Sequence, residues 1–249
     1  MRAKGDRVTT VSEHYEKHLA TVYVWMVGGV DDAFARGDAE IERICPITES
    51  GLKVVDLGAG FGMHAVPLAR RGNNVIAIDE SQILLNALKS NVDDLPIQTI
   101  RDDLVDFPRH LSGEVDLILC MGDTLTHLEN RSAVERLFDS AKRALRPRGR
   151  LVLTFRDYSR VLSDEERFIP VRSDDTKILT CFLEYSESHV MVHDILHEKR
   201  DSAWNLSVSA YQKLRLSPDS VSSSLESRGF TVHLEPGLSG MVRIVATRA

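Results

Sequence analysis

The sequence has few cysteines, and none is placed for pairing. Cys45, Cys120 and Cys181 are the only three in 249 residues. An odd number without a paired spacing argues against a disulfide framework and a cysteine-based metal cluster, and it is typical of proteins in a reducing compartment. We therefore expect a cytoplasmic protein without a bound metal.

Long hydrophobic runs are also lacking. The longest apolar stretch near the start, residues 20–30, is far shorter than the roughly 20 residues that span a bilayer. The polar residues 1–7 have none of the apolar core of a signal peptide. The sequence thus predicts a soluble protein with no membrane partner.

Positive charge is not in excess either. The formal net charge is -6, whereas a broad nucleic-acid-binding surface needs a basic excess. One basic cluster lies between Lys142 and Arg150. We interpret it as the end of a helix and a following loop, where cations complement the helix dipole. We expect no nucleic-acid partner.

What the chain does have is a strand–turn–helix–strand pattern over residues 53–80. An apolar strand leads into Gly58, Gly60 and Gly62, a helical pattern follows, and a second apolar strand ends on Asp79. This order is typical of the nucleotide-binding half of a doubly wound α/β fold. Glycines leave the backbone open to a ligand, and a carboxylate at the position of Asp79 can accept hydrogen bonds from ribose hydroxyls.

The spacing of the glycines distinguishes between nucleotides. A dinucleotide fingerprint needs its third glycine where this chain has Met63. The stretch Asp56-Leu-Gly-Ala-Gly-Phe-Gly62 instead resembles the first motif of class I S-adenosylmethionine-dependent methyltransferases. Asp79 falls where that family has its ribose-binding acid. The alternative, a glycine-rich α/β turn that binds no cofactor, is disfavoured by the combination of these features.

The resemblance implies a Rossmann-like, doubly wound, seven-stranded sheet with its last strand antiparallel. It also implies S-adenosyl-L-methionine as the cofactor. After the third strand, Asp103 takes the position that accepts from the adenine amino group and Leu104 the position against the ring, although a one-residue slip would exchange Asp103 for Asp102. The full cofactor-binding set that we predict is Tyr15, Trp25, Asp56, Gly58, Ala59, Gly60, Asp79, Glu80, Asp103, Leu104 and Met121.

The N-terminal region is predicted to be helical. Residues 11–28 form one or two helices, and residues 31–44 form an amphipathic helix that Pro46 ends. In many small-molecule methyltransferases such a segment folds over the cofactor, which makes Tyr15 and Trp25 candidates for a lid. Packing of the segment against the core explains the two aromatic residues equally well.

The regular alternation of strands and helices is interrupted after the fifth strand. Four extended segments between residues 166 and 216, separated by polar turns, predict an inserted antiparallel sheet. We therefore divide the chain into an N-terminal segment (1–48), a core (49–160 and 217–249) and an insertion (161–216). The insertion is expected to be a substrate cap or an oligomer interface, which leaves room for a homodimer.

The insertion contains three histidines at four-residue spacing, His189, His193 and His197. On a strand, neighbours in this series lie about 13 Å apart. A single ion cannot bind side chains so far apart, because zinc holds its ligands at about 2 Å. We interpret these histidines as a polar face of the sheet, and no metal site is predicted.

Two further stretches narrow the resemblance. Cys120-Met-Gly-Asp-Thr-Leu-Thr-His127-Leu is similar to the fourth-strand motif of glycine and sarcosine/dimethylglycine N-methyltransferases, with Asp123 and Thr124 in place of asparagine and serine. Phe155-Arg-Asp-Tyr158 resembles the end of their fifth strand, where an arginine binds the substrate carboxylate. The resemblance thus implies His127, Arg156 and Tyr158 as substrate-binding residues, the first two of them catalytic.

Alternatives stay open for both catalytic candidates. His127 is either a general base or a histidine that hydrogen-bonds the backbone near the cofactor. Arg156 either binds an anionic substrate in a bidentate manner or forms a salt bridge with Asp157 or another acid at the strand end. The expected function is methyl transfer to a small molecule, an amine or another nucleophile that bears a carboxylate. A non-catalytic S-adenosylmethionine-binding protein and an RNA methyltransferase are the alternatives.

Overall fold

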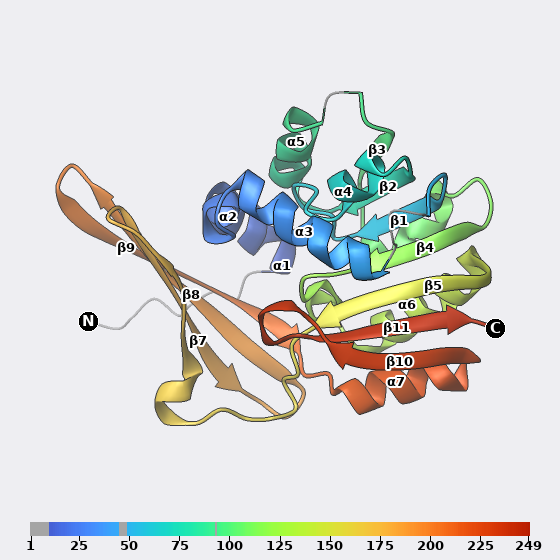
Figure 1. Ribbon diagram of the computed structural model, residues 1–249. Coiled ribbons are helices and arrows are strands. Elements are labelled where there is room, and N and C mark those ends of the chain that lie inside the picture. The colour runs from blue at the N-terminus through green and yellow to red at the C-terminus, as the bar shows by residue number, and fades with distance from the viewer. Residues whose placement is uncertain (1–9, 45–48, 93) are drawn as a thin grey trace.

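The computed structural model describes residues 10–44, 49–92 and 94–249, and its core is a seven-stranded sheet. The strands follow the order β10-β11-β5-β4-β1-β2-β3 (Figure 1). Their bounds are β1 Lys53–Leu57, β2 Asn74–Asp79, β3 Ile97–Arg101, β4 Val115–Cys120, β5 Leu145–Phe155, β10 Phe230–Pro236 and β11 Val242–Arg248. Only β11 runs antiparallel to its neighbours, β5 and β10, among these strands. The predicted Rossmann-like sheet with an antiparallel last strand is confirmed.

Helices cover both faces of this sheet. On one face lie α3 (Val30–Ile44), α4 (Ala65–Arg70) and α5 (Gln82–Ser90), and on the other lie α6 (Arg131–Ala144) and α7 (Pro218–Ser227). The side chains of Ser81, Asn130 and Ser217 cap α5, α6 and α7 by accepting a backbone N–H in the first turn. Because apolar side chains of β1 and β4 point alternately to the two faces, the sheet lies between two buried cores.

The start of β5 differs from the expectation. The sequence predicts a helix end and loop around Pro147, with the strand beginning at residue 151, but β5 begins at Leu145, directly after α6. The register with β4 shifts between Val115 and Leu117, so the extra residues of β5 are accommodated as an irregularity that tolerates a proline. Two of the basic side chains there pair with carboxylates, Arg146 with Asp116 and Arg150 with Glu49.

A second sheet follows β5, as predicted. It is an antiparallel meander of β6 (Phe168–Ser173), β7 (Lys177–Tyr185), β8 (His189–Arg200) and β9 (Ala203–Leu214). The paired ends of β8 and β9 extend well away from the seven-stranded sheet (Figure 1). One face of the meander packs inward through Leu179, Leu183, Val190, Val192 and Tyr211.

The N-terminal segment packs against the inner face of this meander. It consists of α1 (Val11–His14), a π-helical turn, η1 (Tyr15–Leu19), and α2 (Ala20–Met26). Leu19 and Val22 are buried against Leu179 and Leu196 of the meander. The predicted end of the following helix at Pro46 lies outside the described residues. The remaining elements are the 3₁₀ turns η2 (Leu104–His110), η3 (Thr124–His127), η4 (Asp164–Arg167) and η5 (Leu238–Gly240).

Candidate active site

A cavity of about 670 Å³ opens at the carboxyl ends of β1, β2 and β4. Its walls come from the glycine turn after β1, the ends of β2 and β3, the turn η3 and the N-terminal segment. Ligands of doubly wound sheets bind outside the carboxyl ends of the strands, and the volume lies within the usual range for small-molecule sites. The position of the cavity marks it as the candidate site.

The glycine turn and Asp79 form one hydrogen-bonded unit. Gly58 and Gly60 adopt positive φ angles of 72° and 54°. The carboxylate of Asp79 accepts the backbone N–H groups of Gly60 and Ser81, both at 2.8 Å. A Cβ on Gly58 would lie 2.5 Å from Thr124, whereas a Cβ on Gly60 would meet only Leu84. The backbone at Gly60 is therefore open to a ligand in the cavity.

The two aspartates at the end of β3 have different environments. Asp102 accepts hydrogen bonds from Arg109 and His110, which lower its pKa to about 2. Asp103 and Leu104 line the cavity, and the Asp103 carboxylate accepts the Val105 N–H at 2.9 Å. The structure therefore brings Asp103, rather than Asp102, to the cavity.

Most of the predicted cofactor-binding residues line the cavity. They are Tyr15, Gly58, Ala59, Gly60, Asp79, Glu80, Asp103, Leu104 and Met121. Asp56 is not among the lining residues: it is buried at the end of β1, one of its carboxylate oxygens has no hydrogen-bond partner, and burial raises its pKa to about 6.

Trp25 also lies outside the cavity. Its indole N–H donates to Asp174 in the turn between β6 and β7, and the cations of Arg172 and Lys177 lie over its ring. Of the two aromatic lid candidates, Tyr15 lies in the cavity wall and Trp25 fastens α2 to the meander.

His127 is surrounded by aromatic rings. Its ring centroid lies 5.6 Å from that of Tyr15 and 5.8 Å from that of Tyr211, and Tyr15 lies 6.0 Å from Tyr23. Burial lowers the pKa of His127 to about 3, and the nearby Lys213 ammonium adds to this effect. The imidazole is therefore neutral at physiological pH. Its buried Nε2 has no hydrogen-bond partner among the described residues.

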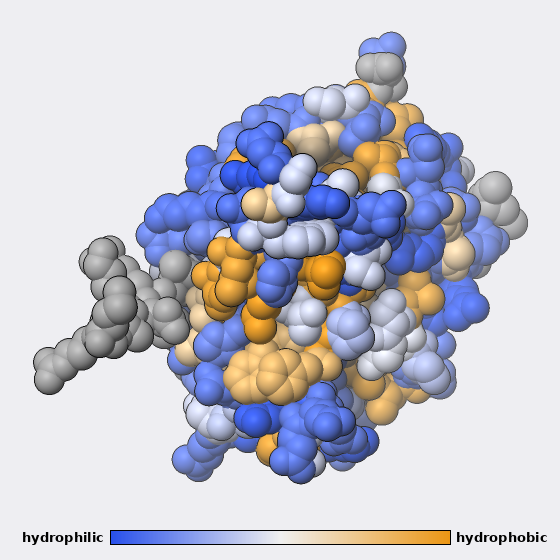
Figure 2. Space-filling model, turned by 90° about the vertical axis from the view of Figure 1, so that its left-hand side faces the viewer, coloured by the Kyte–Doolittle hydropathy of each residue, from blue (hydrophilic) through white to orange (hydrophobic). Residues whose placement is uncertain are grey.

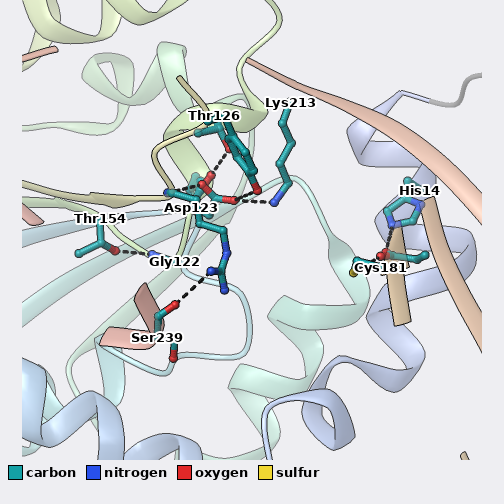
Figure 3. A network of polar contacts seen from close by, with 12 residues as sticks. His14, Gly122, Asp123, Thr126, Thr154, Cys181, Lys213 and Ser239 are labelled. Atoms are coloured by element: carbon teal, nitrogen blue, oxygen red, sulfur yellow. Dashed lines mark hydrogen bonds and ion pairs between the residues drawn. The ribbon is translucent and has the colours of Figure 1, made fainter. Parts of the chain in front are cut away.

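A buried ion pair lies behind this turn. Asp123, in a left-handed conformation with φ of 76°, follows β4 and accepts a hydrogen bond from Lys213 of β9 at 2.6 Å (Figure 3). It also accepts the Tyr158 hydroxyl at 3.1 Å and the Arg156 backbone N–H at 2.9 Å. Burial alone would raise the pKa of Asp123, but the Lys213 ammonium holds it below its usual value. The pair joins the core to the insertion.

The other two predicted substrate residues do not line the cavity. The guanidinium of Arg156 donates to the backbone oxygen of Ser239 at 3.0 Å (Figure 3), and it forms no ion pair with Asp157 among the described contacts. Tyr158 is buried, with its hydroxyl on Asp123. Of the predicted acceptor-site residues, the structure brings only His127 to the cavity.

A second buried polar network fastens the N-terminal segment. His14 contacts Ser209 at 2.6 Å through Nδ1 and Asp194 at 2.9 Å through Nε2, and the Cys181 thiol donates to the other Asp194 oxygen (Figure 3). The His14 ring stacks on Tyr211 with centroids 4.1 Å apart. The segment that carries Tyr15 is thus held by the insertion.

The three histidines of the insertion have separate surroundings. They lie on the face of β8 opposite the buried Val190, Val192 and Asp194. His193 contacts Glu184, whereas His189 lines the cavity. Within residues 10–44, 49–92 and 94–249, no three His, Cys, Asp or Glu side chains form a group that could hold a metal ion. No helix in the same ranges is both long and apolar enough to span a bilayer.

Sequence reasoning missed several residues of the site. Tyr23 and His64 line the cavity, and Lys213 and Tyr211 support His127. The sequence does contain a signal for Lys213. It is a single charged residue on the buried face of β9, two residues after the buried Tyr211. A buried lysine needs a partner, and Asp123, already noted as a departure from the family motif, is that partner.

The family model described as "Methyltransferase domain" matches residues 54–149. Among curated proteins, the glycine/sarcosine N-methyltransferase of Aphanothece halophytica is 27% identical over 157 residues, which are 61% of this chain and 59% of that protein. The ubiquinone biosynthesis O-methyltransferase of Xylella fastidiosa (strain 9a5c) is 35% identical over 111 residues, 42% of each chain. The chain thus spans less than two thirds of the length of these relatives.

Solved structures share the fold over nearly the whole chain. The CcbJ methyltransferase from Streptomyces caelestis gives a TM-score of 0.76 at 17% identity, covering 94% of this chain and 97% of that one. CalS10, an amino pentose methyltransferase from Micromonospora echinaspora, gives 0.73 at 16% identity, covering 92% and 96%. At this level of identity the likeness concerns the fold.

Proposed function

Since the chain carries a class I S-adenosylmethionine-dependent methyltransferase domain, we propose that it methylates a nitrogen atom of a small molecule. The neutral His127, which lines the cavity next to Tyr15 and whose buried Nε2 has no hydrogen-bond partner among the described residues, is the observation that carries the proposal. The amine acceptor agrees with the activity of the glycine/sarcosine N-methyltransferases to which the chain is similar.

The cavity fits the cofactor on physical grounds. Gly60 leaves its backbone open, Asp79 presents a carboxylate held in place by two N–H groups, and Leu104 offers an apolar surface at the end of β3. Asp79 and Glu80 would hold the ribose, and Asp103 and Leu104 the adenine. When bound, the cofactor supplies an electrophilic methyl group on a sulfonium.

The protein contributes by aligning the acceptor amine with the methyl group of the cofactor. A neutral amine has a lone pair that can attack, whereas an ammonium does not. In the tautomer with a free Nε2, His127 accepts an N–H of the neutral amine and directs its lone pair into the cavity, which is a proximity effect. With a pKa of about 3, His127 is too weak a base to hold a proton taken from an ammonium near neutral pH.

The aromatic wall suits a positive centre. Tyr15 and Tyr23 line the cavity, and burial raises the pKa of both phenols, so both stay neutral. Aromatic rings attract cations such as the ammonium formed by methyl transfer to an amine. This favours nitrogen over oxygen as the methylated atom.

The carboxylate of the acceptor stays a prediction. It depended on Arg156, whose guanidinium contacts Ser239 instead of the cavity. Arg156→Lys should raise the acceptor KM if the side chain turns inward on binding, and it should leave KM unchanged if the Ser239 contact persists.

The test is an assay of small amines, carboxylates, phenols and thiols with S-adenosylmethionine, detecting S-adenosylhomocysteine and the mass of the product. We expect turnover with an amine, and a kcat lower by about 10- to 100-fold in His127→Ala with unchanged cofactor affinity. His233→Ala, on β10 in the outer part of the large sheet, is the matched control. Turnover of phenols or thiols alone would contradict nitrogen as the acceptor, and cofactor binding without any turnover would favour a non-catalytic protein.

A further inference from the structure

The outer face of the four-stranded sheet, opposite the face that packs on the N-terminal segment, carries exposed apolar residues on β6, β7 and β9, with His193 and His197 between them on β8. On β9, Trp204, Leu206 and Val208 alternate along one face and pair with Lys199, His197 and Ile195 of β8. Ladder pairing continues this face onto β7 and β6, through Ile178, Phe182 and Phe168. Residues paired in this way share one side of a sheet. We call these residues of β6 to β9 the outer face.

Five large apolar side chains of this face are exposed. Phe168, Ile178, Trp204, Leu206 and Val208 are 52%, 40%, 47%, 61% and 51% exposed, respectively. Figure 2 looks onto this end of the molecule and shows hydrophobic side chains gathered across its middle with hydrophilic ones around them. The five residues together leave on the order of 500 Å² accessible, close to the largest patch of a typical monomer.

The outer face has the character of a sheet face that is normally covered by a second sheet. Its other side is already buried, so the meander resembles one layer of a β-sandwich whose second layer is missing among the described residues. We propose that a second copy of this chain supplies that layer, with the two outer faces packed on each other about a two-fold axis.

Area and charge both favour a second copy. A standard interface buries about 800 Å² per partner, and the five exposed residues with the half-buried Phe182 and Ile195 provide most of that area. A two-fold axis perpendicular to the strands places each end of the face against the opposite end of its partner. Lys199 lies near the projecting end and Glu184 near the base, so opposite charges face each other at both rims.

The interface would also be continuous with the candidate site. The strands β8 and β9 that form the outer face supply His189 and Gln212 to the cavity wall. They also carry Asp194 and Ser209, which hold His14 of the N-terminal segment. Packing of a second sheet would therefore stiffen the strands that hold the segment carrying Tyr15.

The experiment is sedimentation velocity of the full chain over a range of concentrations. The wild-type chain, of 27.9 kDa, should sediment with the mass of two copies. Leu206→Asp should raise the dimer dissociation constant by about a hundredfold, as for a residue at the centre of an interface. Leu234→Asp is the matched control, because Leu234 is 46% exposed on β10 of the other sheet.

Circular dichroism shows whether Leu206→Asp is folded. If it is not, Val208→Glu replaces it. Dilution of the Trp25→Phe chain provides an independent measurement, because the emission of Trp204 should shift to longer wavelength as the outer face becomes solvated. A wild-type chain that is monomeric at every concentration would overturn the proposal. So would a dimer that Leu234→Asp disrupts as strongly as Leu206→Asp, or one that both folded outer-face variants leave intact.

Discussion

His127 lies in the cavity wall, yet its surroundings make it a poor base. Tyr15 and Tyr211 flank its ring, and the Lys213 ammonium lies nearby. Both burial and this positive charge disfavour the imidazolium. The role that follows is hydrogen bonding to a neutral acceptor rather than storage of a proton.

This role predicts a particular pH profile. Because the pKa of His127 is lowered to about 3, kcat/KM should show no limb from this residue between about pH 5 and 9. The rate should instead rise with pH as the acceptor ammonium loses its own proton. A limb near pH 6.5 that disappears in His127→Ala would contradict the assignment.

The buried carboxyl group of Asp56 should make the stability of the fold depend on pH. Burial raises its pKa from 3.8 to about 6, so the folded state retains a proton that the unfolded state loses, and stability falls as the pH rises from about 4 to 6. Above that range the charged carboxylate destabilises the fold by up to about 3 kcal/mol. Asp56→Asn should therefore match the wild type near pH 4 and exceed it at pH 7.5.

Urea unfolding without cofactor at the two pH values measures this difference. Asp106→Asn, an exposed carboxylate in η2, should change little at either pH. If Asp56→Asn is less stable than the wild type at pH 7.5, the buried carboxylate has a favourable partner that outweighs its desolvation.

At the scale of elements, the N-terminal segment is fastened at three points. His14 is bound inside the meander by Asp194 and Ser209, and Trp25 is bound at its edge by Asp174. Between them, Glu16 accepts the backbone N–H of Gln82 at 2.6 Å, at the first residue of α5. The segment that bears Tyr15 therefore bridges the insertion and the core.

The buried contact of His14 with Asp194 should contribute more to the stability of the fold than the exposed contact of Trp25 with Asp174. Asp194→Ala leaves His14 without its carboxylate and should destabilise the fold by about 1.5–3 kcal/mol. Asp174→Ala removes the exposed contact with Trp25, together with the exposed hydrogen bonds that Asp174 accepts from Thr176 and Lys177 in its own turn, and should change stability by under about 1 kcal/mol. Limited proteolysis should then cleave residues 10–26 faster in Asp194→Ala, with protection on adding S-adenosylmethionine. Equal cleavage in both variants would show that the segment is held mainly by its apolar packing.

Local pattern was enough to predict the elements but not the directions of their side chains. The strand, glycine turn and Asp79 lie within one stretch of sequence, so their arrangement follows from spacing. Tyr15 and Trp25 are on one short helical segment, yet they face different neighbours, because one points to the cavity and the other to a turn 149 residues away. Arg156 was assigned from its place after β5, and the long-range contact with Ser239 that orients it has no local signal.

At the scale of the whole molecule, the pair of Asp123 and Lys213 joins two sheets across 90 residues of sequence. Neither charge is stable in the interior alone, so removing one partner leaves the other without compensation. Lys213→Met should destabilise the fold by about 3–5 kcal/mol, and Asp123→Asn should also destabilise it. The double variant should recover much of the loss, since no isolated charge remains.

Chemical denaturation of the wild type, the two single variants and the double variant gives the coupling energy. Lys89→Met, an exposed lysine at the end of α5, should stay within about 0.5 kcal/mol of the wild type. Additive losses would mean that the two charges are stabilised independently and that the insertion is joined to the core by apolar contacts instead.

The position of β11 has a consequence for synthesis. β11 is the last strand along the chain but pairs with both β5 and β10, inside the sheet. While the ribosome is still adding residues 242–248, β5 has an unpaired, apolar edge, which is the kind of surface on which chains aggregate. The insertion, made earlier, can form its meander during that interval because its pairings are between consecutive strands. The nascent protein should therefore acquire its projecting arm before its central layer closes.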